Sequence, residues 1–277
     1  MPFADTAKYF TMEKLTFNAI EAMKSAKAVL MNSYDGFDTE SLDVMSSHPS
    51  MSQTKFLYIG PVAFYNQTTE IPVKKSSIEN WLDVQPKSSV LYIAFGTVFN
   101  IKDEEVVNLA KALATLNCRY VWALKKHQIE HLPSDILVID GDDPIPVDQK
   151  GFVVTWALQR QILNHSATHS FLSHCGWNSC TEALSSATPI IAWPIAAEQK
   201  LNSIVILAKS IGTLIQKTGK ASEHVVTENE IIEAITAHSE NLDEFSLNMK
   251  RYQTLLLESI AEDGNSYNTM KSLYIAE

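Results

Sequence analysis

Short apolar runs alternate with longer amphipathic windows along the chain after residue 77. The runs have the length of buried strands and cover residues 89–95, 120–124, 152–155, 170–173 and 190–192. The windows, which include 102–116 and 178–186, repeat their apolar positions at the spacing of one helix face. Strand–helix alternation of this kind predicts an α/β fold, in which helices cover a Rossmann-like, doubly wound parallel sheet.

Two of the predicted helices carry start signals. In the window 102–116, Val106, Ala110 and Leu113 form one apolar stripe, and the acidic residues 103–105 occupy the first turn, where the helix dipole favours anions. Thr227 followed three residues later by Glu230 is a capping box, so a second helix is expected to begin there.

A polar stretch over residues 66–77 separates two parts of the chain. Before it, residues 28–31 and 56–59 have the pattern of short buried strands, and this first part is too small to form a core of its own. We therefore expect a first segment at 1–68, a linker at 69–77, a main domain at 78–250 and a helical segment at 251–277.

Composition narrows the classes of function. The formal net charge is -10 and the pI is about 5.3, so a nucleic-acid-binding surface is not expected, because such surfaces need dense Lys and Arg. The three cysteines show no disulfide framework, and no apolar run is long enough for a membrane span. These features favour a soluble cytoplasmic protein with neither nucleic-acid nor membrane partners.

Two glycine-containing loops follow predicted strands, and both are candidates for binding an anion. One is Phe95-Gly96-Thr97, and the other runs from His174 to Ser179 and opens a helix. At Gly96 and Gly176 the missing side chain would let the backbone approach a phosphate closely. Because ligands of doubly wound sheets bind at the carboxyl ends of strands, both loops should lie along one edge. No G-x-G-x-x-G motif occurs, which argues against a nicotinamide or flavin site.

A helix amino terminus is a local device by which an acidic protein can bind a diphosphate. His174, Asn178 and Ser179 surround such a terminus, although Asn178 or Ser179 could instead serve only as a helix cap. A zinc site formed by His169, His174, Cys175 and Cys180 is a further alternative, but their spacing matches no common zinc motif. We therefore expect no metal.

The segment from Trp156 to Gln199 carries a dense set of motif residues. It contains Trp156-Ala157-Leu158-Gln159, then His174-Cys175-Gly176-Trp177-Asn178-Ser179, Glu182, Pro189, Trp193-Pro194 and Glu198-Gln199. This pattern resembles the plant-type nucleotide-sugar signature of UDP-dependent glycosyltransferases, the inverting family 1 enzymes of GT-B fold. Residues 88–97 resemble the start of the carboxyl-terminal domain of that family, and residues 28–34 and 58–61 resemble the last strands of its amino-terminal domain.

The resemblance assigns roles to individual residues. It implies that Trp156 stacks on uracil, that the Ala157 backbone bonds the uracil edge, and that Gln159 reaches towards the ribose. The residues implied to bind UDP are Gly96, Thr97, Trp156, Ala157, Gln159, His174, Gly176, Trp177, Asn178, Ser179 and Glu182, and those implied to bind the sugar are Trp177, Glu198 and Gln199. Leu158 departs from the usual proline of the family, which should loosen the turn without removing a contact.

The resemblance also implies what this chain does not contain. Family members take a histidine general base and the acceptor site from their amino-terminal domain, and no segment before residue 78 resembles the strand and loop that carry that histidine. We therefore expect the donor-binding portion of a UDP-glycosyltransferase, with UDP-glucose as the expected donor, a small-molecule acceptor and no assigned catalytic residue. A truncated transferase is the first interpretation; one subunit of a split transferase and a non-catalytic nucleotide-sugar-binding module are the alternatives.

Overall fold

The structure is a computed structural model that describes residues 17–64, 75–215 and 224–275, and residue contacts divide the chain into two units. Unit 1 comprises residues 1–69 and 254–277, and unit 2 comprises residues 70–253. Most of the linker expected at 69–77 lies outside the described residues. Within its described end, Ser76 is the N-cap of the first helix of unit 2.

Unit 2 alternates strands and helices. In chain order it contains α3 (Ser77–Asp83), β3 (Val90–Ala94), α4 (Asp103–Leu116), β4 (Arg119–Ala123), the 3-10 helix η3 (Lys126–His131), β5 (Val138–Ile139), β6 (Gly151–Val154), α5 (Gln159–Leu163), β7 (Thr168–Ser173), α6 (Trp177–Ser186), β8 (Ile190–Ala192), α7 (Gln199–Ala208), β9 (Gly212–Leu214), α8 (Glu228–Glu240) and most of α9 (Leu242–Ile260). The strands form one sheet in the order β5-β6-β4-β3-β7-β8-β9, and every pair is parallel. The doubly wound α/β fold is thus confirmed.

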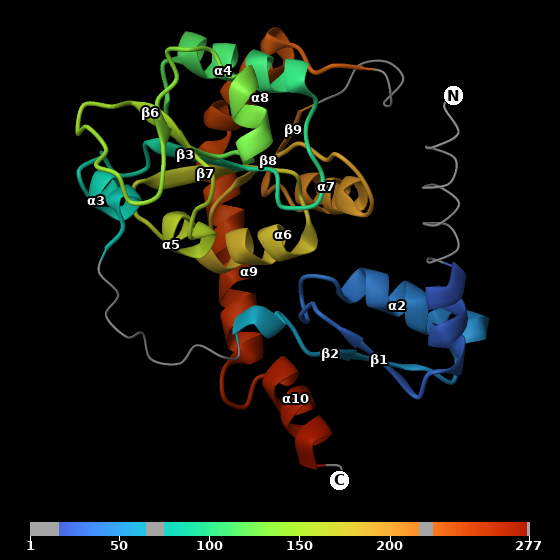
Figure 1. Ribbon diagram of the computed structural model, residues 1–277. Coiled ribbons are helices and arrows are strands. Elements are labelled where there is room, and N and C mark those ends of the chain that lie inside the picture. The colour runs from blue at the N-terminus through green and yellow to red at the C-terminus, as the bar shows by residue number, and fades with distance from the viewer. Residues whose placement is uncertain (1–16, 65–74, 216–223, 276–277) are drawn as a thin grey trace. The chain divides into compact units, whose positions relative to one another are not determined.

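The two faces of this sheet are covered by different helices. Successive residues of a strand point to opposite faces. On β3, Leu91 and Ile93 belong to the core under α4 and α8, whereas Tyr92 stacks on Phe171 with ring centroids 5.1 Å apart. Figure 1 shows α4 and α8 on one side of the sheet and α5 and α6 on the other. Tyr92 therefore belongs to the layer that carries the motif helices.

The α4–α8 layer is joined by a buried carboxylate. Glu105, 2% exposed, accepts from Lys102 N at 2.8 Å at the start of α4 and from Val226 N at 3.2 Å just before α8. The predicted capping box of α8 is confirmed, since Thr227 N donates to Glu230 and Glu230 N donates to Thr227 Oγ1. Residues that were predicted as helix start signals thus make contacts within their own helix, and Glu105 also links α4 to the start of α8.

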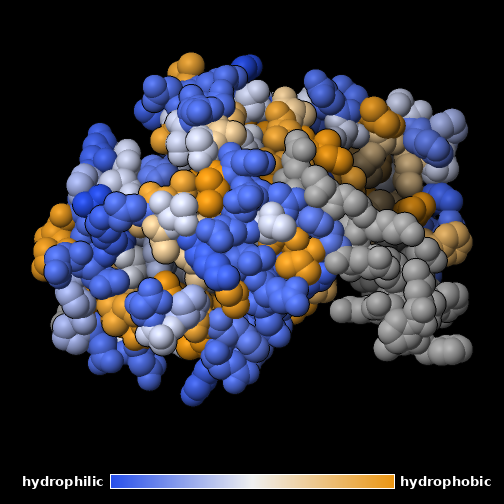
Figure 2. All heavy atoms as spheres, turned by 90° about the horizontal axis from the view of Figure 1, so that it is seen from above, coloured by the Kyte–Doolittle hydropathy of each residue, from blue (hydrophilic) through white to orange (hydrophobic). Residues whose placement is uncertain are grey.

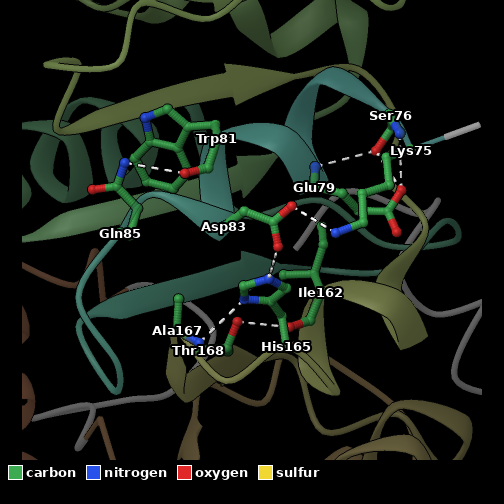
Figure 3. Close-up of polar contacts among 10 residues, drawn as sticks. All are labelled: Lys75, Ser76, Glu79, Trp81, Asp83, Gln85, Ile162, His165, Ala167 and Thr168. Carbon is green, nitrogen blue, oxygen red and sulfur yellow. Dashed lines mark hydrogen bonds and ion pairs between the residues drawn. The ribbon is translucent and has the colours of Figure 1, made fainter.

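Helix α3 is held against the α5–β7 turn by one carboxylate. The two oxygens of Asp83 contact different partners, Lys75 Nζ at 2.6 Å and His165 Nε2 at 3.2 Å, as Figure 3 shows. Trp81 adds a hydrogen bond from Nε1 to Gln149 O at 3.0 Å. These contacts fasten the beginning of unit 2 to the layer that contains α5.

Unit 1 contains a helix over 17–25, β1 (Ala28–Met31), α2 (Thr39–Ser47), η1 (Pro49–Met51), β2 (Lys55–Tyr58), η2 (Val62–Phe64), the end of α9 and α10 (Asn265–Ile275). Strands β1 and β2 pair in parallel, from Ala28 opposite Lys55 to Met31 opposite Tyr58. Both predicted strands are confirmed to within one residue. Two strands of this length provide few ladder hydrogen bonds, so packing of helices against them must supply much of the stability.

The surface of unit 2 over α4 and α8 is mostly hydrophilic, with scattered small apolar groups, as seen in Figure 2. For α4 this is the outer side of the amphipathic pattern by which the helix was predicted. Across the described ranges, none of the helices combines the length and the apolar character that a membrane crossing needs.

Two histidines form a buried polar cluster between β7, β9 and α8. His238 is 0% exposed; its Nε2 lies 2.9 Å from Ser170 Oγ and its Nδ1 lies 3.1 Å from Thr213 Oγ1. The same Ser170 hydroxyl contacts His169 Nδ1 at 2.6 Å. Burial lowers the pKa of His238 to about 3 and that of His169 to about 4. Both rings are therefore neutral in the folded protein near neutral pH.

This cluster predicts acid-sensitive stability. An unfolded histidine titrates near pH 6.5, so below that pH the unfolded chain binds protons that the folded chain rejects, and the free energy of unfolding falls by about 1.4 kcal/mol per pH unit for each histidine. The loss from His169 runs from about pH 6.5 to about pH 4, and the loss from His238 continues to about pH 3, where each folded ring is protonated in turn.

We expect His238→Gln to reduce the slope of unfolding free energy against pH by about 1.4 kcal/mol per pH unit, because glutamine keeps a polar group for Ser170 but does not titrate. Urea unfolding followed by circular dichroism at several pH values measures this slope. The slope reports titration even where the variant is less stable at every pH. An unchanged slope would contradict the assignment.

Candidate functional site

The carboxyl ends of several parallel strands of unit 2 open onto one cavity of about 790 Å³. This volume falls within the range of about 300–1,000 Å³ that is typical of small-molecule sites. Every site residue predicted from the sequence lines it: Gly96, Thr97, Trp156, Ala157, Gln159, His174, Gly176, Trp177, Asn178, Ser179, Glu182, Glu198 and Gln199. The sheet topology thus brings together residues that are up to about a hundred positions apart in the sequence.

Strand register places the two glycine loops side by side. Ala94 at the end of β3 pairs with Ser173 at the end of β7, so the loops that follow begin at the same level. The His174 ring lies between them: an added Cβ would come within 2.5 Å of Nε2 at Gly96 and within 2.6 Å at Gly176. Gly96 also has a φ of +71°, which residues other than glycine rarely adopt. Both glycines therefore make room for an imidazole.

The environment of His174 favours its neutral form. Burial lowers the pKa of His174; Glu198 acts against this shift and Lys125 acts with it. Within the described residues, the buried Nδ1 atom has no hydrogen-bond partner. A neutral ring whose Nδ1 lacks a partner places its proton most favourably on Nε2, the atom nearest both glycines.

The amino terminus of α6 places backbone donors that lack an intrahelical partner at the cavity. The N-cap is Gly176, and the first intrahelical bond runs from Cys180 N to Gly176 O at 3.0 Å. The N–H groups of the turn before Cys180 therefore have no partner within the helix. The alternative that Asn178 or Ser179 caps this helix is wrong, because both residues lie inside α6 and no side chain caps it. The helix begins one residue earlier than predicted.

A polar chain connects β3, α5 and α6 beneath the cavity. Gln159 Nε2 donates to Glu182 Oε2 at 2.6 Å and to Ser179 Oγ at 3.2 Å, and Tyr92 donates from its hydroxyl to Gln159 Oε1 at 3.4 Å. Glu182 is half-buried, and its side-chain contact is the Gln159 amide. One carboxylate oxygen, Oε1, is left for a ligand by these contacts.

Trp156 is 70% exposed although it follows a buried strand. Its neighbour Leu158 is the N-cap residue of α5, with φ -75°, so the helix begins at Gln159 without the proline that the signature usually has. A large aromatic side chain exposed on a cavity wall offers an apolar face for stacking.

Glu198 and Gln199 differ in their contacts. Gln199 is 3% exposed, and its Oε1 accepts hydrogen bonds from Ile195 N and Ala196 N, both at 2.9 Å. Glu198 is exposed at the start of α7. The side-chain oxygen of Gln199 therefore holds the β8–α7 loop, and its amide nitrogen is the group left to face the cavity.

No metal site accompanies the cavity. Among the described residues, no three His, Cys, Asp or Glu side chains are grouped so that they could hold a metal ion. His169 instead contacts Ser170, and the three cysteines are free thiols.

Sequence reasoning missed part of the cavity wall. The additional lining residues are Tyr92, Ala94, Val98, Phe99, Ala123, Leu124, Lys125 and Thr155. Most follow from one rule: Leu124 and Thr155 come directly after strands β4 and β6, and Lys125 follows Leu124, at the edge where the sheet predicts a ligand. Tyr92 could not be found in this way because it lies inside a strand.

Comparison with known proteins identifies a family and several relatives that this chain matches. Residues 19–246 match the model of the family described as UDP-glucoronosyl and UDP-glucosyl transferase. UDP-glycosyltransferase 708C1 of Fagopyrum esculentum is 31% identical over 214 residues, which are 76% of this chain and 45% of that protein. UDP-glycosyltransferase 71C2 of Arabidopsis thaliana is 29% identical over 255 residues, 91% of this chain and 53% of that protein. The chain thus spans about half the length of these relatives.

A solved structure shares the fold. The crystal structure of TcCGT1 in complex with UDP has a TM-score of 0.76 and 26% sequence identity, and the match covers 92% of this chain and 57% of that one.

The packing of His174 between two glycines predicts a coupled pair. Gly176 has φ -61° and ψ 143°, which alanine can adopt, so any cost of Gly176→Ala must come from its Cβ pressing on the ring. We expect Gly176→Ala to destabilise the protein by about 1–3 kcal/mol, and to cost little when His174 is also alanine. Chemical denaturation of the two single variants and the double variant measures the coupling. Equal costs in both backgrounds would show that the ring does not fill this space.

Proposed function

The chain belongs to the UDP-glucoronosyl and UDP-glucosyl transferase family, and we propose that its cavity binds the UDP-sugar donor of an inverting glycosyl transfer to a hydroxyl group. One observation carries the proposal: every residue that the resemblance assigns to UDP or sugar binding lines a single cavity at the carboxyl edge of the sheet. Ligands of doubly wound sheets bind at that edge.

The base and ribose of the donor fit one end of the cavity. The exposed face of Trp156 would stack on uracil, and the backbone of Ala157 would bond its edge. Glu182 would accept from the ribose hydroxyls with the carboxylate oxygen that Gln159 leaves open. In this arrangement Gln159 also orients Glu182, because its amide nitrogen bridges Glu182 and Ser179.

The diphosphate fits the amino terminus of α6. Backbone N–H groups of the first turn, at Trp177, Asn178 and Ser179, point at the space in front of the helix, where the dipole favours negative charge. His174 would add a donor at Nε2, and the loop at Gly96 and Thr97 would close the other side. The same groups would stabilise UDP as it leaves.

The sugar would lie beside Trp177, Glu198 and Gln199 at the start of α7. The carboxylate of Glu198 accepts hydrogen bonds and the amide nitrogen of Gln199 donates them, which suits an array of hydroxyls. Glucose is the sugar that we propose, and no metal takes part in this arrangement.

We further propose that this chain supplies the donor half of the reaction, in the cytoplasm, and that the acceptor site and the general base come from an amino-terminal acceptor domain, of which residues 1–68 are the end. Relatives about twice as long support this division. One solved neighbour, from Phytolacca americana, is complexed with UDP-2fluoro-glucose and pterostilbene, which agrees with a small phenolic acceptor.

Nucleotide selectivity tests the proposed function. We expect UDP to bind more tightly than ADP or GDP, because the diphosphate contacts are shared and only uracil satisfies the edge at Ala157. We also expect Trp156→Ala to weaken UDP binding by about 1–3 kcal/mol through lost stacking and to leave inorganic pyrophosphate binding unchanged. Calorimetry measures both. Equal affinities for the three nucleotides would reduce the cavity to a generic phosphate site.

The two ends of the Gln199 side chain allow a test of the sugar site. Gln199→Glu keeps an oxygen for Ile195 N and Ala196 N but removes the amide donor, so UDP-glucose should bind about 10-fold more weakly while UDP binds as before. Gln199→Ala serves as the comparison, since it removes the loop contacts as well. A parallel loss for UDP and UDP-glucose in Gln199→Glu would mean that the residue is only structural.

A further inference from the structure

The cavity contains an unbalanced set of charges. Its lining includes the carboxylates of Glu182 and Glu198, and Lys125 is the one Lys or Arg side chain among the lining residues that the structure describes. The chain as a whole carries a formal net charge of -10. An anionic ligand must therefore bind against a negative electrostatic potential. The distance of the Lys125 ammonium group from the bound anion decides how much it offsets this repulsion.

Lys125 is placed by the register of the central strands. Ala123, the last residue of β4, pairs with Ala94, the last residue of β3, so Lys125 emerges beside the β3–α4 loop. Its Nζ donates to Phe99 O at 3.0 Å and to Asn100 Oδ1 at 2.7 Å. The ammonium group thus holds the loop that contains Gly96 and Thr97.

The ammonium group has capacity beyond these two bonds. It carries three N–H donors, and both printed acceptors are neutral oxygens. Within the described ranges, no carboxylate forms an ion pair with Lys125. Partial burial lowers the pKa of Lys125, and no acidic group opposes that shift. A half-buried cation without a counter-ion costs desolvation free energy that a bound anion would recover.

The charge of Lys125 acts where the phosphates would lie. It lowers the pKa of His174, and Glu198 raises it, so both charges lie close to the ring between the two glycine loops. We propose that Lys125 is the counter-charge for the diphosphate of the ligand, in addition to holding the β3–α4 loop in place. This rests on the proposed function, since it assigns a further binding residue within the same cavity.

A ligand series separates the electrostatic role from the structural one. Uridine, UMP and UDP share the base and ribose and differ only in phosphate charge, so a counter-charge must matter more with each phosphate. We expect Lys125→Met to weaken UDP binding about 10- to 100-fold, the factor for losing a hydrogen bond to a charged group, and uridine binding by less than about twofold. The affinity of UDP should also become less dependent on salt.

Two controls accompany this series. Lys126→Met removes an equal charge from the next residue, which is exposed and does not line the cavity, and should leave all affinities unchanged. Asn100→Ala removes one of the loop contacts and keeps the charge, so it should weaken UDP binding less than Lys125→Met does. Calorimetry covers the tight ligands, and NMR titration covers uridine.

The outcomes distinguish this inference from the proposed function. If Lys125→Met weakens uridine and UDP by the same factor, Lys125 only positions the loop and the counter-charge is overturned. If UDP binding is unchanged in Lys125→Met, Lys125 contributes to binding neither as a counter-charge nor by positioning the β3–α4 loop, and the inference is overturned. If the wild-type protein binds ADP as tightly as UDP, uracil recognition fails, yet loss of both diphosphates in Lys125→Met still supports the counter-charge. If no nucleotide binds, both proposals fail.

Discussion

The parallel pairing of β3 with β7 is the constraint on which the site depends. Because Ala94 lies opposite Ser173, two loops separated by about 80 residues in the sequence begin side by side. The His174 ring fills the space between them, and Gly96 and Gly176 are the residues that leave this space open. A shift of one residue in the register would turn the strand side chains to the wrong faces and separate the loops. The cavity is therefore a product of sheet register as much as of motif residues.

Anion binding in an acidic chain requires several local sources of positive potential acting together. The dipole and the first-turn N–H groups of α6 supply one, and they cost no side-chain entropy because the helix is already formed. A lysine supplies another at the end of β4, where it is fixed by two oxygens of the opposite loop. The two acidic residues of the cavity, Glu182 and Glu198, are the groups to which the proposed function assigns the hydroxyls of the ligand.

The sequence predicted the repeating architecture because apolar periodicity reports which faces are buried. The five strands after residue 77 and the starts of α4, α6 and α8 agree with their observed bounds to within about two residues. Strands β5 and β9 were missed, since β5 has only two residues and the three residues of β9, Gly212–Leu214, do not form an apolar run. Helices α5 and α7 were missed for a different reason: α5 is only five residues long, and the apolar residues of α7 are concentrated in a continuous run at 204–208 without helical spacing.

The signature predicted many of the residues that line the cavity, but it could not predict contacts that arise from tertiary pairing alone. The bond between Gln159 and Glu182 joins two helices, and no pattern in the sequence indicates it. The structural role of Gln199 could not be predicted from the sequence either. Its oxygen accepts from the backbone N–H groups of Ile195 and Ala196, and no sequence pattern indicates such a contact. The two glycines were expected to admit a phosphate, and the structure shows that they first admit an imidazole.

The central claim is that this edge of the sheet is a UDP site, and a crystal structure of the chain soaked with UDP tests it most directly. The account predicts the diphosphate in front of α6, within hydrogen-bonding distance of the backbone at residues 177–179, with uracil stacked on Trp156 and the ribose hydroxyls on Glu182. UDP bound elsewhere on the chain, or placed in the cavity with its base away from Trp156, would contradict the account.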